Sequence, residues 1–358
     1  MVKQYVVQSV TRSTWLDSMG VVVRPSDYAM LNAYSGLAGA CAQLNANAVS
    51  NTPYTLNRGD DYEAPEVTTH PFLETMKKPN PFMGPKALWK YTQLCLEMAG
   101  KAYWKIVPGV LTPVVEIYPL QPHLVTPEMS VNNTITGWRY DKELLTLDQV
   151  VQFFCADPLN PYGSGKGPAE IAWAEIMLMS NDTALMTALM KNGGAPSHVL
   201  SPKDQQGVVS PTILTRLQAA WQSFKGRGAG RLFIPEIPVE LTTLAQTSKD
   251  FEGSARFDQL KSIIMAVFGI PSALFDSAGS RAELDAAILQ HARLAVDPRT
   301  TLLEDVVNRR VLPLYGDDVN LYFEPNLEED VEDTEKQGLP TGPNPSAGTR
   351  MNPQEDAA

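Results

Sequence analysis

The sequence has few of the residues that build metal centres, disulfide frameworks and acid–base sites. Its 358 residues include three cysteines and four histidines. No cysteines are spaced as CxxC, and no histidines as HxxxH or HExxH. The cysteines stand in apolar segments, which predicts buried free thiols in a reducing compartment, and the histidines are predicted to be structural: Cys41, Cys95, Cys155, His70, His123, His198 and His291. We therefore predict no metal and no cofactor.

Motifs for nucleophilic catalysis and phosphate binding are also lacking. There is no GxSxG elbow, and the many carboxylates are scattered, so no general acid and base can be paired. The run GSGKG at residues 163–167 looks like a phosphate loop, but Gly167 stands where that loop needs Ser or Thr, and Asn160 where it needs its first glycine. A loop that enters a helix is the better interpretation.

Positive charge is scarce, since the formal net charge is −11. A protein that grips duplex DNA by its phosphates normally presents a basic face, so contact with DNA would be local and loose. The N-terminal residues lack the apolar core of a signal peptide. The most apolar long segment, residues 169–190, contains Glu170, Glu175 and Asp182, which argues against a membrane span.

What the sequence does contain is an alternation of helical and strand-like segments, which predicts an α+β fold. Helices are expected over residues 31–51, around Leu73 and Met76, and over 86–99, the last ending at Gly100. Strands are expected at 54–56, 102–107, 114–120, 134–140, 150–155 and 319–323. The four strands between residues 102 and 155 predict one small antiparallel sheet packed on the preceding helices.

A long helix is predicted from Pro168 to Lys191, and it is apolar on nearly every side. A helix of this kind has to be covered on several faces. One small domain rarely achieves this, whereas subunits packed side by side in a ring can. The candidate subunit-packing residues are Trp173, Ile176, Met177 and Met186.

An α/β insert follows at residues 194–249, with a strand at 197–200, a helix at 211–224 and strands within 232–241. The locally basic run KGRGAGR lies between this helix and the strands within 232–241, and it contains Lys225, Arg227 and Arg231. This run either meets phosphates or an acidic partner, or is an exposed turn.

The stretch from Asp250 to Leu294 organises the chain. Its first helix ends at Gly269, before Pro271; a loop of small residues follows, and a second helix begins near Arg281 with Glu283 in its first turn. We expect Leu284, Ala287, Ile288 and His291 to share the apolar face of this second helix. An ordinary helix–loop–helix core explains the spacing, but loops on rigid elements often carry function. A further helix starts at residues 297–298.

Taken together, these segments resemble the portal proteins of tailed bacteriophages, of the HK97 type, over roughly residues 31–325. The resemblance is carried by the order of NANAVSNTPYTL, HPFLETMKKPNPFMG, PYGSGKGPAEIAWAEI, AWQSFKGRGAGRLFI and FDQLKSIIMAVFGIPSALFD. The last is the most specific, because its IxxxFGIPxxLF pattern is similar to the family's signature.

The resemblance implies a portal fold that assembles into a ring, usually of about twelve copies. It implies the following organisation: N-terminal arm 1–30, wing 31–167, stem helices 168–193 and 250–269, clip 194–249, tunnel loop 270–280, wing- or crown-proximal helices and strand 281–326, and a disordered acidic and Pro/Gly-rich tail 327–358. Since the C-terminal part is short, a well-formed crown is in doubt.

The same resemblance implies a role at the unique capsid vertex, where DNA enters and leaves through the ring. Ser277, Gly279, Ser280 and Arg281 would belong to the channel loop, and the three basic residues of KGRGAGR would face the packaging motor. Expected partners are further copies of the chain, double-stranded DNA bound non-specifically, the major capsid protein, the terminase large subunit and neck proteins, with no membrane. The location would be the virion, and the host cytoplasm during assembly.

Two alternatives stay open. Another ring component of the head–tail connector would use similar symmetry, although such chains are usually shorter. A phage-encoded hydrolase would need a nucleophile–base pair or a metal cluster, which the sequence does not show. We therefore predict that the chain is not an enzyme.

Overall fold

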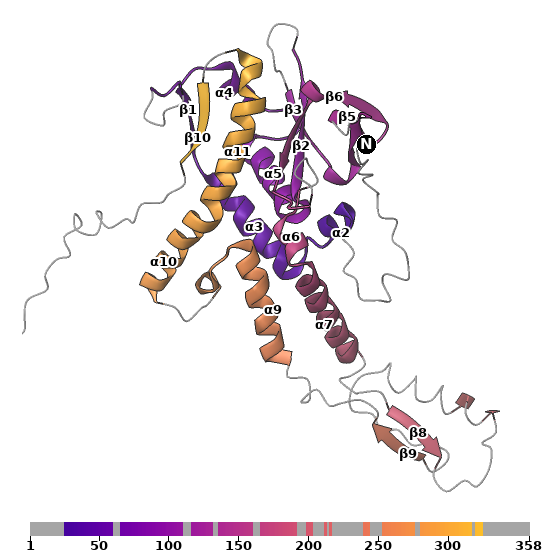
Figure 1. Cartoon of the computed structure of the whole chain (residues 1–358). Helices are drawn as coiled ribbons and strands as arrows, with labels where there is room; N and C mark the ends of the chain where they lie inside the picture. Colours follow the sequence, from indigo (N-terminus) through magenta and orange to yellow (C-terminus); the bar gives the residue numbers. More distant parts are fainter. Residues whose placement is uncertain are drawn as a thin grey trace, which may run out of the picture.

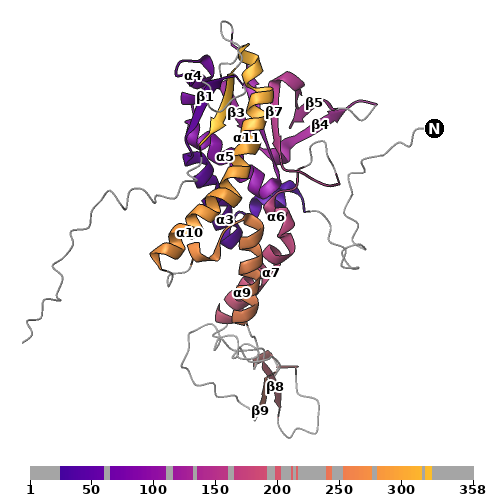
Figure 2. The same cartoon turned by 60° about the vertical axis from the view of Figure 1, so that its left-hand side comes forward.

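The computed structural model describes residues 25–59, 65–109, 116–131, 135–159, 165–191, 198–202, 211–212, 215–216, 239–243, 253–275, 280–316 and 319–324. Within them helices and strands alternate as an α+β fold. We call the upper part in Figure 1 the body. The projecting pair of long helices, α7 (Trp173–Lys191) and α9 (Gly253–Phe268), is called the stalk. The antiparallel strand pair β8 (His198–Pro202) and β9 (Val239–Thr243) is drawn beyond the stalk (Figures 1 and 2).

Helices form the centre of the body. They are α2 (Asp27–Asn32), α3 (Gly36–Asn51), α4 (Pro71–Lys77), α5 (Pro85–Ala99) and α11 (Asp297–Arg310). Local sequence sets their ends. Gly100 adopts φ +70° at the end of α5, as predicted for a helix-terminating glycine. The predicted helix over 31–51 is wrong at its start, because Ser35 is extended, with φ −154°, and separates α2 from α3.

The strands of the body pair only in antiparallel fashion. They are β1 (Tyr54–Arg58), β2 (Lys101–Val107), β3 (Glu116–Leu120), β4 (Val125–Met129), β5 (Ile135–Tyr140), β6 (Glu143–Thr146), β7 (Val150–Phe154) and β10 (Val319–Phe323). Their orders are β3-β2-β7, β4-β5-β6 and β1-β10. The prediction of a single small sheet over residues 102–155 is therefore wrong. It missed β4 and β6, which are short and mostly exposed, and Pro127 lies within β4.

The core of the body is aromatic. The ring centroids of Trp89 and Trp104 lie 5.1 Å apart, and those of Trp104 and Phe153 4.7 Å apart. Phe323 closes the cluster, 5.2 Å from Trp89. Because Phe323 belongs to β10 and pairs with Tyr54 of β1, the end of the described chain is tied to its beginning. This core packs the helices and strands of the body together, and the stalk projects from the body.

The predicted long helix from Pro168 is present but interrupted. It comprises α6 (Pro168–Ile171) and α7 (Trp173–Lys191), separated by Ala172, whose φ of −91° and ψ of 18° are not helical. The distal strands β8 (His198–Pro202) and β9 (Val239–Thr243) form the antiparallel pair of the predicted insert. Of the predicted helix over 211–224, residues 211–212 and 215–216 are helical, and the rest lies outside the described residues.

The second stalk helix, α9 (Gly253–Phe268), returns toward the body, and α10 (Arg281–His291) begins away from the body and runs back into it at an angle to α9 (Figure 1). A five-residue π-helix, Ala292–Val296, joins α10 to α11. The predicted stop at Gly269 and the predicted start near Arg281 are both confirmed.

Candidate subunit-packing surface and the junction beneath it

The stalk is held by an apolar seam between its two helices. Ile176 and Met179 of α7 share one buried cluster with Leu260 and Ile264 of α9. An ion pair between Arg256 and Asp182, at 3.5 Å, lies beside this seam. The same cluster includes residues of α3 and α6, so the inner part of α9 is packed on the body as well.

Several large apolar side chains of the stalk point to solvent. Stalk residues with more than a third of their surface exposed are Met177, Leu178, Phe257 and Ile263, and Ile171 of the neighbouring α6 is exposed as well. Single exposed apolar residues are ordinary, but a cluster of them marks an interaction surface. These exposures agree with the prediction that the helix from Pro168 to Lys191 needs to be covered by surfaces outside its own chain.

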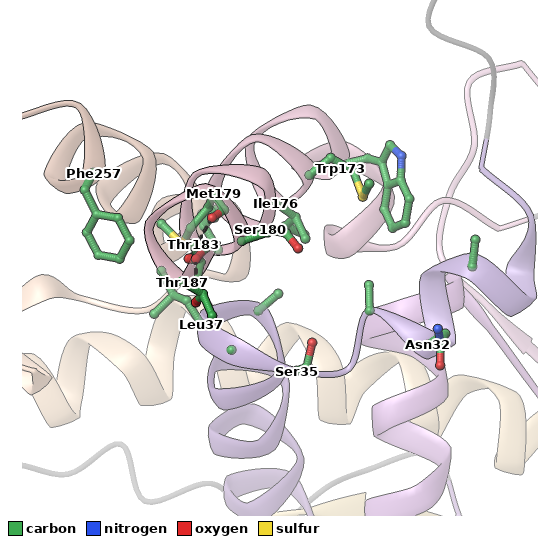
Figure 3. Close-up of a pocket in the computed structure, with 17 residues that line it drawn as sticks. Asn32, Ser35, Leu37, Trp173, Ile176, Met179, Ser180, Thr183, Thr187 and Phe257 are labelled. Carbon is green, nitrogen blue, oxygen red and sulfur yellow. Dashed lines mark hydrogen bonds between the residues drawn. The ribbon is translucent and has the colours of Figure 1, made fainter. Parts of the chain in front are cut away.

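A hollow of about 920 Å³ lies where the stalk meets α2 and α3 (Figure 3). Its apolar wall contains Trp173, Ile176, Met177, Met179 and Phe257. Hydroxyl groups of Ser180, Thr183 and Thr187 interrupt this wall, and those of Thr183 and Thr187 donate to carbonyl oxygens one turn earlier in the same helix. None of its lining residues carries a charge.

Three of the four predicted packing residues therefore meet at one place. Trp173 is half-buried, Ile176 is buried and Met177 is 39% exposed, and all three line the hollow. Met186 is half-buried farther along α7 and is not among the lining residues.

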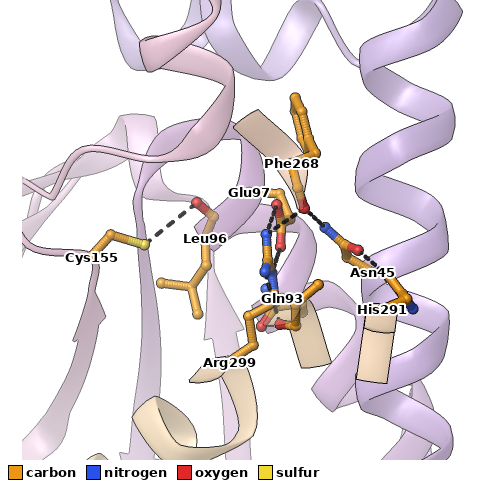
Figure 4. Close-up of polar contacts among 9 residues, drawn as sticks. Asn45, Gln93, Leu96, Glu97, Cys155, Phe268, His291 and Arg299 are labelled. Atoms are coloured by element: carbon orange, nitrogen blue, oxygen red, sulfur yellow. Dashed lines mark hydrogen bonds and ion pairs between the residues drawn. The ribbon is translucent and has the colours of Figure 1, made fainter. Parts of the chain in front are cut away.

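A buried polar junction fixes the root of the stalk (Figure 4). Arg299 of α11 donates from Nε and Nη2 to both carboxylate oxygens of Glu97 on α5, and Glu97 is only 1% exposed. The same Nη2 donates to the backbone oxygen of Phe268, at 3.1 Å, where α9 ends. Gln93 donates to Glu97 at 2.6 Å. One guanidinium thus connects α5, α9 and α11.

A second arm of this junction reaches α3 and α10. Asn45 Nδ2 donates to the oxygen of Phe268 at 2.9 Å, and Asn45 Oδ1 lies 2.8 Å from Nε2 of His291. Because that amide oxygen can only accept, His291 donates from Nε2. Burial, with the charge of Arg299 second, lowers the pKa of His291 below its ordinary value of 6.5. The imidazole is therefore kept neutral at physiological pH.

Gly269 allows the chain to turn away at this junction. Its φ is +75°, and Ile270 donates its N–H to the oxygen of Met265 at 2.9 Å, the bond that defines a Schellman ending. A Cβ on Gly269 would lie 3.2 Å from the Cβ of Ala295. The IxxxFGIP motif therefore encodes a helix end packed against the π-helix.

The glycine-rich run before α6 packs backbone against backbone. A Cβ on Gly100 would lie 2.4 Å from the nitrogen of Gly167, and one on Gly165 would lie 2.0 Å from the oxygen of Gly100. These contacts lie at the C-terminal end of α5, where the helix dipole is negative and disfavours phosphate. The interpretation of residues 163–167 as a loop that enters a helix accounts for these glycines.

The predicted channel and motor-facing residues are only partly described. Ser280 caps α10, since its Oγ accepts from the N–H of Glu283 and the Glu283 side chain accepts from the N–H of Ser280. Arg281 is 95% exposed and lies 3.9 Å from Asp285. Residues Ser277, Gly279, Lys225, Arg227 and Arg231 lie outside the described residues.

The expected apolar face of α10 is only half buried within the chain. Ala287 and His291 are buried, but Leu284 is 43% and Ile288 is 53% exposed. The four residues were predicted to share one apolar face, and the structure buries only two of them. Leu284 and Ile288 stay exposed because no described part of the chain covers them.

The cysteines have inert environments. None of the three forms a disulfide; Cys41 and Cys95 are buried, as predicted, whereas Cys155 is half-buried and its thiol lies 3.9 Å from the oxygen of Leu96. Burial raises the pKa of Cys41 to about 11 and the pKa values of Cys95 and Cys155 to about 12. At neutral pH all three remain thiols.

Sequence reasoning missed the residues of the polar junction. Glu97 stands in an otherwise apolar helical face, and Asn45 in an Ala-rich helix. Such isolated polar residues are a signal of buried pairing, but they do not identify the partner, which lies 202 residues away for Glu97 and 246 for Asn45. Within the described part of the chain, no group of three or more His, Cys, Asp or Glu side chains converges on a common point as metal ligands do. No described helix combines the length and the hydropathy needed to span a bilayer.

Solved structures share this fold. A protein in the "Neck of empty GTA particle computed with C6 symmetry" matches with a TM-score of 0.63 and 19% identity, covering 87% of this chain and 86% of that one. A protein in the "Neck of native GTA particle computed with C12 symmetry" matches with a TM-score of 0.60 and 17% identity, covering 86% of this chain and 88% of that one. An HK97 family phage portal protein from Corynebacterium diphtheriae matches with a TM-score of 0.60 and 13% identity, covering 86% of this chain and 95% of that one. These likenesses define the class of protein as one with the portal fold.

The sequence is matched by the profile of the phage portal protein family over residues 38–337. The chain therefore belongs to the phage portal protein family. It is also 22% identical, over 300 residues, to an uncharacterized protein of Rickettsia bellii (strain RML369-C); this match covers 79% of the chain and 76% of that protein. The resemblance stated from the motifs is confirmed.

Proposed function

We propose that the chain is the subunit of a portal ring at the unique vertex of a phage-type capsid. The observation that carries this proposal is the family match over residues 38–337. The role is structural, and we assign the chain no catalytic activity. The ring would reside in the virion, and its subunits in the host cytoplasm during assembly.

We infer that the ring closes by contacts between unlike surfaces of neighbouring copies, as cyclic symmetry above twofold demands. The similar neck structures were obtained with C6 and C12 symmetry, which supports a ring of about twelve copies. The exposed apolar side chains of the stalk, Met177 and Phe257 among them, supply surface for such contacts.

The division of the chain into parts follows from this role. We assign residues 31–167 to the wing, 168–193 and 250–269 to the stem, 194–249 to the clip and 270–280 to the tunnel loop. The arm 1–30, the helices and strand 281–326 and the tail 327–358 complete the map. The projecting position of α7 and α9 supports the stem assignment (Figure 2).

We further propose that double-stranded DNA passes through the ring without sequence-specific contacts. A net charge of −11 disfavours tight phosphate binding, so DNA can slide. Arg281, 95% exposed at the start of α10, is the candidate cation facing the channel. Lys225, Arg227 and Arg231 are the candidates for contact with the terminase, and later with neck proteins. The major capsid protein would surround the ring.

The experiment that tests the proposal is the mass of the purified protein by light scattering, with electron micrographs of the same fraction. Rings of about twelve copies with a central hole are expected. A stable monomer or dimer, both alone and after co-expression with the capsid protein, would contradict the assignment. Deletion of residues 277–280 should leave rings intact and impair DNA packaging in the phage-type particle. Normal packaging by that deletion would contradict the role of the loop.

A further inference from the structure

Helix α10 has little within its own chain to stabilise it. Of its 11 residues only Ala287 and His291 are buried. Helices shorter than about 12–15 residues are marginal in water unless an apolar face is packed. Leu284 and Ile288, one turn apart, together with Leu294 of the π-helix, are 43%, 53% and 63% exposed. We call Leu284 and Ile288, which lie on the same side of α10, the ridge.

The hollow and the exposed face of α10 belong to different helices of the chain. In Figure 1, α10 projects on the left, whereas α7 and α2, which border the hollow, lie on the right. Figure 2 again shows α10 on the left, with α7 at the centre. None of the residues that line the hollow belongs to α10, so one chain carries both an exposed apolar helix face and a separate uncharged hollow.

We propose that the ridge of one copy docks in the hollow of the next copy. This inference rests on the proposed function, because in a closed ring the ridge of every copy meets the hollow of a neighbouring copy. A contact that repeats around a ring joins two different surfaces of the same chain, and these have to be complementary. Leu284 and Ile288 at positions i and i+4 are the spacing with which an amphipathic helix enters an apolar groove.

Size and charge favour a second copy as the occupant. A hollow of about 920 Å³ is large enough to take several side chains. No lining residue carries a charge, so a nucleic acid would find no cation there to neutralise its phosphates. Docking would also desolvate the exposed part of Met177 without burying an unpaired charge.

The test is cross-linking in assembled rings. Met177→Cys and Ile288→Cys are introduced together, and rings of confirmed mass are treated with a short bis-maleimide. The native cysteines react slowly, since burial raises their pKa values to about 11 or 12. The matched control combines Met177→Cys with Leu144→Cys, because Leu144 is 65% exposed on β6, away from the ridge.

A ladder of covalent multimers is expected from the first pair and not from the control. Rings that form normally but give no ladder with the first pair, or the same ladder with both, would overturn the docking and leave the ring assignment standing. If the unmodified chain forms no ring at all, the proposed function fails, and the docking fails with it.

A second variant does not depend on cross-linking. Ile288→Asp should raise the concentration at which half of the chains form rings by about tenfold or more, because a charge would enter the apolar hollow. Its helical content as a monomer should be unchanged, since Ile288 is 53% exposed. Leu144→Asp serves as the control. Equal ring formation by Ile288→Asp and the unmodified chain would contradict the proposal.

Discussion

The body and the stalk of this chain use apolar residues in opposite ways. In the body, Trp89, Trp104 and Phe153 are at most 2% exposed and pack against one another. In the stalk and α10, Phe257 and Ile288 are about half exposed. The core of the body therefore has the packing of an independently stable fold, whereas the projecting helices carry apolar faces that the described chain leaves exposed. Substitutions that separate the stability of the chain from the assembly of a ring test this difference.

The largest effect is expected from Trp104→Ala in the body. Trp104 is fully buried, and its Nε1 donates to Thr92 Oγ1 at 2.7 Å, so the substitution creates a cavity and removes one of the two hydrogen bonds of that hydroxyl. The free energy of unfolding should fall by about 3–5 kcal/mol. Urea titration of the dissociated chain measures this. Phe82→Ala, at an 85% exposed position, should stay within about 0.5 kcal/mol. Similar losses from both would mean that the body is not closely packed.

Substitution at the junction should rank second. Glu97→Gln leaves Arg299 without its carboxylate in a site where Glu97 is 1% and Arg299 17% exposed. We expect a loss of about 3 kcal/mol, because an ion of the pair stays buried and uncompensated. The double variant Glu97→Gln with Arg299→Met should lose less than Glu97→Gln alone.

The control for this prediction is the exposed pair of Lys77 and Glu74, also at 2.7 Å but with side chains 69% and 65% exposed. Glu74→Gln should change the free energy of unfolding by less than about 0.5 kcal/mol. If Glu97→Gln behaved like Glu74→Gln in the same urea titration, the junction would not be what attaches the stalk to the body.

The glycine contact between α5 and α6 gives the third prediction. Gly100→Ala meets the backbone of Gly167, whereas Gly316→Ala, at a similar φ of +79°, meets nothing within 4 Å. Gly316→Ala should therefore show only the strain of a left-handed alanine, about 1 kcal/mol, and Gly100→Ala about 2–3 kcal/mol. Thermal unfolding of the two variants side by side measures the difference. Equal losses of stability in the two variants would mean that the backbone of Gly167 moves away from the added methyl group at no cost in free energy.

Local features of this fold could be predicted from the sequence, and long-range ones could not. The stop at Gly100, the stop at Gly269 and the start of α10 near Arg281 depend on neighbouring residues only, so they could be predicted; the cap formed by Ser280 was not predicted. The pairing of Tyr54 with Phe323 and the contact of Asn45 with His291 join distant segments, and no local pattern encodes them.

Periodicity also could not say what covers an apolar face. Leu284 and Ile288 follow the same spacing as core residues, yet the described chain leaves both exposed. The apolar character of the helix from Pro168 to Lys191 did lead to Trp173, Ile176 and Met177, and the structure brings these together at the hollow. Composition thus pointed to these residues, but the position of the hollow could be found only from the folded chain.

A smaller effect is expected from pH, acting on the arm of the junction next to α10. Burial, and then the charge of Arg299, lowers the pKa of His291 below 6.5. The unfolded chain therefore takes up a proton near pH 6.5 while the folded chain does not, so the stability from this site is complete above that pH. It is lost as the pH falls below 6.5 toward the lowered pKa of the folded state. His291→Gln should show a smaller loss of stability between pH 7 and pH 5 than the unmodified chain, by urea titration at both pH values. Equal losses would exclude His291 as the titrating group.

The smallest effect is expected on the open face of the stalk, and it tests the contrast most directly. Leu178 is 39% exposed, whereas its neighbour Met179 is 8% exposed and packs in the seam with α9. In the dissociated chain, Leu178→Ala should change the free energy of unfolding by less than about 0.5 kcal/mol, and Met179→Ala should lower it by about 2 kcal/mol or more. Urea titration at a protein concentration too low for rings to form measures the free energy of unfolding of both variants. If Leu178→Ala were as damaging as Met179→Ala, the outer face of the stalk would be packed within the chain, and a neighbouring copy would not be needed to explain its composition.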